Sequence, residues 1–225
     1  MIRNLFITLL LLIPALNRAD TNKPLPPPVP TELLSVLKLP EKGLSGEVYQ
    51  LAMRGYQKLV QEGKLRNSAI LTIIDFSQSS TKKRFYVIDL LHKALLFNTY
   101  VAHGRNTGEE YATHFSNATG SLKSSLGFYV TKEEIRGAST GLSLVLDGLE
   151  KGINDNAVKR EIIMHGAAYA TEDFIKRTGR LGRSFGCPSL PPDQIRAVVE
   201  TIKEGSCLFI YQNDDQYIHH SALLR

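Results

Sequence analysis

The sequence predicts a mainly β domain with a few helices, a β-sandwich or barrel-like sheet that follows an N-terminal helical extension. Two observations support this fold class. Short apolar segments rich in β-branched and aromatic residues follow one another after residue 67, with turn-forming residues between them. An amphipathic helix precedes this series, and one late helix comes before its last member. We therefore expect a helical extension over residues 31–66 and one domain over residues 67–225.

The extension is predicted to contain two helices. The first is an apolar segment from Thr31 to Leu39, and the second runs from about Gly46 to Glu62. Ser45 can cap the second helix, and Gly63 ends it. Its buried stripe recurs at i, i+3, i+4 spacing and consists of Val48, Leu51, Ala52, Tyr56, Leu59 and Val60.

The domain is predicted from a series of strand signals. These are Ala69 to Phe76, Arg84 to Asp89, Ala94 to His103, Gly127 to Thr131, Leu142 to Leu146 and Glu161 to His165. A helix is predicted to begin near Pro192 and to end at Gly205. Its inward-facing residues are Ile195, Val198, Val199 and Ile202. The compact apolar run 207–211 predicts a buried last strand.

The N-terminus resembles a targeting segment. Arg3 precedes an apolar run from Leu5 to Leu16 that is short for a membrane span, so residues 1–19 are predicted to be a signal peptide. An uncleaved membrane tether is the alternative. Residues 20–30 form a proline-rich spacer of extended, polyproline-like backbone. This layout predicts an exported protein, periplasmic or associated with the cell envelope.

The charge of the chain limits its partners only weakly. The formal net charge is +5 over 225 residues, a mild positive balance that suits an anionic surface and is also ordinary. Basic and aromatic residues do not interleave as they do in nucleic-acid-binding proteins, so nucleic acid is not an expected partner. The sequence leaves the oligomeric state open.

Cys187 and His165 are the candidate nucleophile and general base. Cys187 lies in the glycine-punctuated run 182–188, and His165 ends the apolar stretch 162–165. A free cysteine is mostly protonated at neutral pH, so a histidine within hydrogen-bond reach is needed to generate the thiolate. A histidine satisfied at the end of a strand is the alternative for His165.

Gly186 and Ser184 are expected to shape the site around the thiol. Gly186 permits a positive φ, and the amide groups of such a turn can converge on an oxyanion. Ser184 is expected either to donate its hydroxyl to that oxyanion or to orient the imidazole through its carbonyl. A turn-stabilising serine is the alternative.

A disulfide between the two cysteines is the structural alternative to a catalytic thiol. Exported proteins often carry such bonds, and Cys187 and Cys207 are the only cysteines of the sequence. Cys207, however, lies in the apolar run 207–211, where a cysteine is often just a small hydrophobe. We therefore expect both thiols to be free.

The residues around Cys187 resemble the signature of L,D-transpeptidases, the YkuD-type enzymes that cross-link peptidoglycan. His165-Gly166 followed by Ser184-Phe185-Gly186-Cys187 is similar to their HG…(S/T)xGC motif. The run 124–129 looks like the family's TPxGxF strand entry, and 205–210 looks like its closing GTxVxI strand. Three further runs, 115–117, 148–150 and 154–156, are similar to a divergent subfamily of murein L,D-transpeptidase catalytic domain proteins. The resemblance covers roughly residues 68 to 212 and implies a YkuD-like catalytic domain.

One departure from the family pattern concerns the substrate. Many members place an arginine two residues after the cysteine to help hold the donor peptide, and this chain has Ser189 there. We expect either that Arg183 substitutes for it or that substrate recognition differs in this chain. Arg180 and Arg183 are expected to make the approach to Cys187 basic and to attract stem-peptide carboxylates. A solvated loop is the alternative for these arginines.

Two further positions are expected at the substrate surface. His103, in a second His-Gly pair at a strand end, is expected to line the cleft or steer the substrate carboxylate, and a structural turn histidine is the alternative. Gly166, which follows His165, is the second position expected to bind the substrate. A zinc site built on His103, His114 and His165 lacks any ligand spacing, so no metal site is expected.

The resemblance implies a two-step reaction on peptidoglycan stem peptides. Cys187 would form an acyl-enzyme with a tetrapeptide stem, and an amine of a neighbouring stem would resolve it to a 3-3 cross-link. No metal or organic cofactor is needed, and carbapenem-type β-lactams are expected covalent inhibitors. An L,D-carboxypeptidase or muropeptide hydrolase with the same dyad, attachment of a protein to the wall, and a non-catalytic peptidoglycan-binding module are the alternatives.

Overall fold

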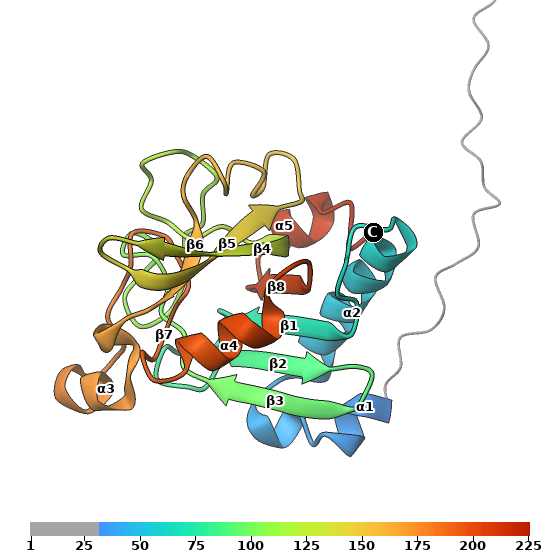
Figure 1. Cartoon of the computed structure of the whole chain (residues 1–225), viewed down its shortest axis with the longest axis horizontal. Helices are drawn as coiled ribbons and strands as arrows, with labels where there is room; N and C mark the ends of the chain where they lie inside the picture. The colour runs from blue at the N-terminus through green and yellow to red at the C-terminus, as the bar shows by residue number, and fades with distance from the viewer. Residues whose placement is uncertain (1–31) are drawn as a thin grey trace, which may run out of the picture.

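The computed structural model describes residues 32–225, so the predicted signal peptide and proline-rich spacer lie outside the described residues. One mixed sheet of eight strands, in the order β3-β2-β1-β8-β4-β5-β6-β7, dominates the domain (Figure 1). The prediction of a mainly β domain with a few helices is confirmed. Within the described part of the chain, no helix is long and apolar enough to cross a membrane.

The strands are short and lie close to the predicted segments. They are β1 (Ile70–Asp75), β2 (Phe85–Asp89), β3 (Ala94–Thr99), β4 (Gly127–Gly137), β5 (Gly141–Gly148), β6 (Ile163–Gly166), β7 (Ser189–Leu190) and β8 (Cys207–Tyr211). The third strand ends four residues earlier than the predicted His103. The two-residue β7 was not predicted, because it is too short to show a periodicity.

Among residues 32–225, five α-helices accompany the sheet. They are α1 (Glu32–Val36), α2 (Gly46–Gln61), α3 (Glu172–Thr178), α4 (Ile195–Ile202) and α5 (Asp215–His220), with single 3-10 turns at Pro40–Lys42 and Ala168–Ala170. The first two helices and α4 were predicted from the sequence, whereas α3 and α5 were not. Both missed helices are short and depend on local caps, since Thr171 and Asp214 each accept a hydrogen bond from a backbone N–H three residues ahead.

The centre of the sheet joins the two ends of the domain. β1 pairs in parallel with β8, and Leu71 faces Cys207 in the register. β8 pairs on its other side with β4, and all five of its residues are buried. A strand covered on both faces has a continuous apolar sequence, which explains the run 207–211. Cys207 is therefore a buried core residue with a free thiol.

The amphipathic helix α2 packs against β1 and β8 at the middle of the sheet. Its cap is the predicted one, since the Ser45 hydroxyl accepts from the Val48 N–H at 3.2 Å. Gly55 faces the ring of Phe128, and a Cβ at this position would overlap that ring. The predicted stripe is wrong at Val60, which is exposed although its neighbour Leu59 is buried.

The two edges of the sheet approach one another and nearly close it. The chain that leaves β3 forms an antiparallel bridge from Ala102 to Ser189 of the opposite edge strand β7. A second bridge joins Gly104 to Ser184 in the segment that leads into β7. In Figure 1 the half made of β4, β5 and β6 lies above the half made of β1, β2 and β3. The near-closure brings residues 102–104 against the loop that holds Cys187.

Candidate active site

Strand register brings the predicted nucleophile and base to the same place. β6 pairs in parallel with β7, and His165 lies opposite Ser189. Cys187 stands two residues before Ser189, at the end of the loop that enters β7. His165 and Cys187 are 22 residues apart in the sequence. The chain between them leaves β6 and returns to pair with it through β7, which brings the two residues together.

The thiol of Cys187 is free and half-buried. Its Sγ accepts a hydrogen bond from the Ile163 N–H at 3.5 Å and lies 3.6 Å from the Glu161 carbonyl oxygen, to which it can donate. Burial raises the pKa of the thiol, and the Ile163 N–H and the Arg160 charge only partly offset this. The thiol is therefore protonated at rest and needs a base.

His165 is held through both ring nitrogens. Nδ1 lies 3.1 Å from the Gly166 carbonyl oxygen, and Nε2 lies 3.0 Å from the Ser189 hydroxyl. A carbonyl oxygen only accepts, so we assign the proton to Nδ1 and the lone pair to Nε2. Burial lowers the pKa of His165, which keeps the ring neutral and able to act as a base.

Ser189 and Tyr169 complete this network. The Ser189 Oγ lies between His165 Nε2 and the Tyr169 hydroxyl, 3.0 Å from each. Ser189 donates to the lone pair of His165 and accepts from Tyr169. Among the hydrogen bonds of the described residues, none joins Cys187 Sγ to His165, because Ser189 occupies the lone pair at rest.

Ser184 and Gly186 form a tight turn under the nucleophile. The Ser184 hydroxyl donates to the Cys187 carbonyl oxygen at 2.6 Å and accepts from the Gly186 N–H at 3.0 Å. Gly186 has φ +130°, a conformation that a side chain rarely tolerates. The Ser184 carbonyl accepts from Arg105 N–H at 2.8 Å, so the carbonyl that orients the imidazole belongs to Gly166. Ser184 thus stabilises the turn, and its hydroxyl is engaged there.

With this geometry established, the family relationship of the chain is clear. Residues 40–211 match the family model described as L,D-transpeptidase catalytic domain. The chain belongs to this family. The match begins before residue 67, so it takes in helix α2 as well as the predicted domain up to the end of β8. A comparison with curated protein sequences found no significant match.

The chain is also similar, at low sequence identity, to solved structures of L,D-transpeptidases. An L,D-transpeptidase from Mycobacterium smegmatis is 12% identical to this chain, with a TM-score of 0.41. The match covers 64% of this chain and 59% of the M. smegmatis chain. An L,D-transpeptidase in complex with imipenem has the same identity and coverages and a TM-score of 0.39. The helical cell shape determining protein Pgp2 from Campylobacter jejuni is 13% identical, with coverages of 73% and 57% and a TM-score of 0.44. This family member thus spans less than two thirds of the length of these three chains.

The predicted substrate residue His103 lies in the interior of this L,D-transpeptidase-family domain. Its side chain is 1% exposed, Nδ1 accepts from Arg84 Nη2 at 2.8 Å, and Nε2 lies 3.3 Å from the Gly108 carbonyl oxygen. Burial and the Arg84 charge lower the pKa of His103 to about 3. Both nitrogens are engaged, so His103 supports the fold from behind the cysteine loop and does not face a cleft.

The predicted arginines are engaged by one carboxylate. Arg180 Nη2 lies 2.7 Å and Arg183 Nη1 2.5 Å from the two carboxylate oxygens of Glu109. Arg183 Nη1 also donates to the carbonyl oxygens of Arg105 and Gly108. These contacts tie the loop before the cysteine to the loop after residue 104, and they neutralise much of the positive charge that the sequence offers there.

Gly166 lies at the end of β6 against the start of the late helix. A Cβ at this position would be 3.0 Å from the Ile195 side chain and 3.3 Å from Pro192. Its carbonyl orients His165, as described above. The role that the structure supports for Gly166 is close packing behind the imidazole.

Three residues of the site were missed from the sequence. Ser189 was noted only as a departure from the family pattern, and Tyr169 and Arg160 were not singled out. A candidate general base needs a partner that orients it, so a hydroxyl near His165 could be expected. The sequence does not show which hydroxyl this is, because the contact depends on tertiary packing. Arg160 lies beside the cysteine turn, since a methyl group on Gly186 would be 3.6 Å from its Nη2.

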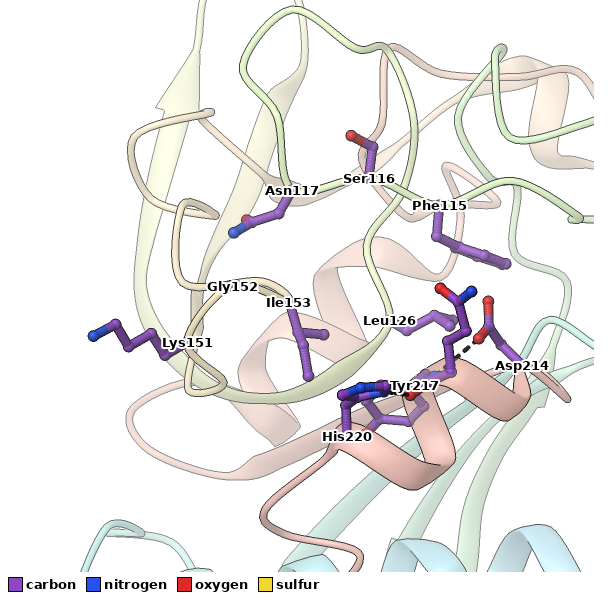
Figure 2. Close-up of a pocket in the computed structure, with 11 residues that line it drawn as sticks. Phe115, Ser116, Asn117, Leu126, Lys151, Gly152, Ile153, Asp214, Tyr217 and His220 are labelled. Atoms are coloured by element: carbon purple, nitrogen blue, oxygen red, sulfur yellow. Dashed lines mark hydrogen bonds between the residues drawn. The ribbon is translucent and has the colours of Figure 1, made fainter.

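Two hollows lie near this machinery. One of about 250 Å³ adjoins the cysteine turn and is lined by Thr119, Gly120, Leu122, Lys159, Arg160, Glu161, Ile162 and Phe185. The other, of about 560 Å³, lies between the loop 115–117, the turn 151–153 and helix α5 (Figure 2). Phe185 in the first hollow is 69% exposed, next to Gly186 and Cys187. The first hollow therefore borders the cysteine turn through Phe185, although neither Cys187 nor His165 lines it.

Proposed function

We propose that the protein is a cysteine-dependent peptidoglycan L,D-transpeptidase. One observation carries this proposal: the register of β6 and β7 sets a neutral, carbonyl-oriented His165 beside the turn of a free Cys187. Membership of the L,D-transpeptidase catalytic domain family supplies the substrate class. Catalysis on peptidoglycan also requires export, to the periplasm or the cell envelope.

The first half-reaction acylates the cysteine. His165 Nε2 takes the proton of the Cys187 thiol, and the thiolate attacks the carbonyl carbon between an L-configured centre and the terminal D-alanine of a stem tetrapeptide. The bond to the D-alanine nitrogen breaks, and the protonated His165 returns its proton to the leaving amine. The product is a thioester on Cys187 and free D-alanine.

The resting contacts define what must move first. His165 Nε2 faces Ser189, and Cys187 Sγ faces the segment 161–163. Rotation of the Cys187 side chain away from residues 161–163 and toward His165, with Ser189 releasing the lone pair, forms the direct contact. Catalytic hydrogen bonds often form only when the substrate is bound. The Gly166 carbonyl accepts from Nδ1 throughout and so stabilises the imidazolium.

The second half-reaction resolves the thioester. A side-chain amine of a neighbouring stem attacks the thioester carbonyl and expels the thiolate, which gives a 3-3 cross-link. Attack by water instead releases the acyl group and makes the protein an L,D-carboxypeptidase. The hollow of about 250 Å³ beside the cysteine turn is the proposed donor surface, where the cationic Lys159 and Arg160 suit a substrate carboxylate.

Intact-mass spectrometry of the purified protein tests the proposal. We expect incubation with a muropeptide tetrapeptide, or with a carbapenem, to add one acyl group to the wild type and to Cys207→Ala. Cys187→Ala should gain no mass. Cys207 is the matched control because it is buried in β8 and lies outside the cysteine turn.

The products then separate the alternatives. Release of D-alanine with cross-linked dimers supports the transpeptidase, and release with a shortened tripeptide supports the carboxypeptidase. A folded wild type that acquires no adduct from either reagent contradicts both and leaves the peptidoglycan-binding module, which a pull-down with isolated sacculi would detect.

A further inference from the structure

Arg160 binds four different residues of one loop. Its Nη1 donates to the Ser116 carbonyl oxygen at 2.7 Å and to the Ser125 hydroxyl at 2.5 Å. Its Nη2 donates to the Lys123 carbonyl oxygen at 2.6 Å and to the Ser121 hydroxyl at 3.2 Å. The guanidinium therefore holds the segment 116–125, defined here as the support loop, at four points.

The support loop in turn carries the cysteine turn. Its Ser124 hydroxyl donates to the Gly186 carbonyl oxygen at 2.9 Å and accepts from the Gly104 N–H at 3.0 Å. Gly104 and Gly186 are in close contact, because a Cβ on Gly104 would lie 2.9 Å from the Gly186 Cα. The position of Gly186, and of Cys187 after it, depends on where the support loop lies.

The support loop has a hollow on one side. Figure 2 shows its first residues, Ser116 and Asn117, at the border of the cavity of about 560 Å³ above helix α5. Side-chain packing from that side is therefore missing, and hydrogen bonds must replace it. Asn117 supplies two of them, to Asp155 at 2.7 Å and from the Asn156 N–H at 3.1 Å. Asn106 and Thr107 bind the middle of the loop, and Arg160 supplies its four bonds from the cysteine side.

The charge of Arg160 is not paired with a carboxylate. All four of its acceptors are carbonyl or hydroxyl oxygens, and none of the ion pairs among residues 32–225 includes it. Arg180 and Arg183 differ, since both bind Glu109. A half-buried cation bound only to neutral oxygens keeps its full field for a nearby anion.

That anion would form at Cys187. The Arg160 Nη2 lies 3.6 Å from the position of a Cβ on Gly186, and Cys187 Sγ contacts the backbone of residues 161 and 163, which follow Arg160 directly. Burial lowers the pKa of Arg160 and raises that of the Cys187 thiol, and the two opposite charges act against both shifts: the Arg160 charge lowers the pKa of the thiol, and the thiolate raises the pKa of Arg160. Burial of the thiol opposes this effect and outweighs it at rest.

We propose that Arg160 is a positioning residue with two tasks: it holds the support loop against the cysteine turn, and it places an unpaired positive charge beside the Cys187 thiolate. The chain has no cation two residues after the cysteine, because Ser189 stands there. Arg160, in the segment before β6, supplies a cation in its place. The consequence for turnover rests on the proposed function, whereas the consequence for thiol acidity does not.

The rate of Cys187 alkylation by iodoacetamide, measured from pH 6 to 10, tests the charge. In Arg160→Gln we expect the midpoint of the pH profile to rise by about one unit, which slows alkylation at pH 7 roughly tenfold. Arg160→Lys keeps a cation, so its midpoint should stay near the wild-type value. Arg54→Gln is the matched control, since Arg54 also donates to a backbone carbonyl, that of Leu224 at 2.9 Å, but lies on α2.

Carbapenem acylation tests the positioning. Arg160→Lys loses the fork that spans the support loop, and its acylation should be roughly fivefold slower at an unchanged alkylation midpoint. A folded Arg160→Gln variant with the wild-type alkylation midpoint would overturn the charge role. Arg160→Lys acylating at the wild-type rate would overturn the positioning role. This second test remains valid even if Arg160→Gln does not fold. If the wild-type protein is alkylated by iodoacetamide but never acylated by a carbapenem, the proposed function is contradicted. The effect of Arg160 on the acidity of the thiol can still be measured in that case.

Discussion

The domain contains two histidines in the same dipeptide, His103-Gly104 and His165-Gly166, on the two segments that flank the cysteine loop. They adopt opposite tautomers. Arg84 only donates, so Nδ1 of His103 is its acceptor and the proton lies on Nε2, which faces the Gly108 carbonyl. In His165 the carbonyl faces Nδ1, and the lone pair lies on Nε2.

The difference lies in what occupies each lone pair. A buried guanidinium holds that of His103 permanently, whereas a hydroxyl that can rotate holds that of His165. A hydroxyl can donate to the neutral ring and accept from the protonated one, so His165 can change its charge while its neighbours stay in place. The group that binds the free ring nitrogen, more than the histidine itself, separates a base from a structural side chain.

Removal of the base should have the largest effect. We expect His165→Ala to slow carbapenem acylation of Cys187 by about 10²- to 10⁴-fold, the usual value of a general base. Intact-mass time courses measure the rate, and a melting curve confirms the fold. His103→Asn, which keeps an acceptor for Arg84, is the control and should acylate within about threefold of the wild type. Equal losses in the two variants would remove the distinction drawn above.

The structural histidine depends on its guanidinium. Arg84 is fully buried, binds the carbonyl oxygens of Val101 and Gln78 as well as His103, and lies 4.8 Å from the centre of the Phe76 ring. Arg84→Met leaves these buried acceptors unsatisfied and should lower the free energy of unfolding by about 3 kcal/mol. Urea denaturation measures this, with Arg54→Met expected to cost less than about 1 kcal/mol. A loss under about 1 kcal/mol for Arg84→Met would show that the network contributes little.

The pH dependence of stability should come mainly from His103. Its folded pKa of about 3 is far below the ordinary value of 6.5, so below pH 6.5 the unfolded chain binds a proton that the folded chain does not. Stability therefore falls as the pH drops from 6.5 toward 3, by up to about 1.4 kcal/mol per pH unit for one histidine. Burial lowers the pKa of His165 in the same direction.

Urea unfolding at pH 5, 6 and 7 checks this dependence. His103→Asn should flatten the slope substantially, because Asn does not titrate, and His165→Asn should flatten it less. A slope that is unchanged in His103→Asn would mean that this ring is protonated in the folded protein.

The hydroxyl relay should give the smallest effect. Tyr169→Phe removes the donor to Ser189 and leaves the bond from Ser189 to His165, so acylation should slow about two- to fivefold, or roughly 0.5–1 kcal/mol. Tyr56→Phe is the control, because its hydroxyl binds the Ser68 carbonyl away from the site. No change in Tyr169→Phe would assign the orientation of His165 to Ser189 and Gly166 alone.

Much of the fold could be predicted from local pattern. Buried strands such as β1 and β8 are continuous apolar runs, and α2 has its cap and stripe in the sequence. The elements that were missed, β7, α3 and α5, are too short for any period to show. The parallel pairing of β1 with β8 has no local signal, because it joins residues at opposite ends of the domain.

The site was predictable only as far as chemistry identifies reactive side chains. Cys187 and His165 stand out by residue type and turn context, whereas their partners depend on tertiary packing. His103 was expected near the substrate because the sequence does not show that Arg84 lies behind it. Arg180 and Arg183 were expected to face the substrate, since their pairing with Glu109 crosses two loops. Arg160 carries no motif at all.

The pairing of β1 with β8 has a consequence for the order in which the molecule matures. Leu71 and Cys207 lie far apart in the sequence, so we expect the middle of the sheet to form late in folding. Before it forms, both thiols should be accessible to each other and to oxidants. Completion of the sheet encloses Cys207 and leaves Cys187 as the one reactive sulfur of the described chain. Folding itself is thus the step that protects the nucleophile from its own partner cysteine.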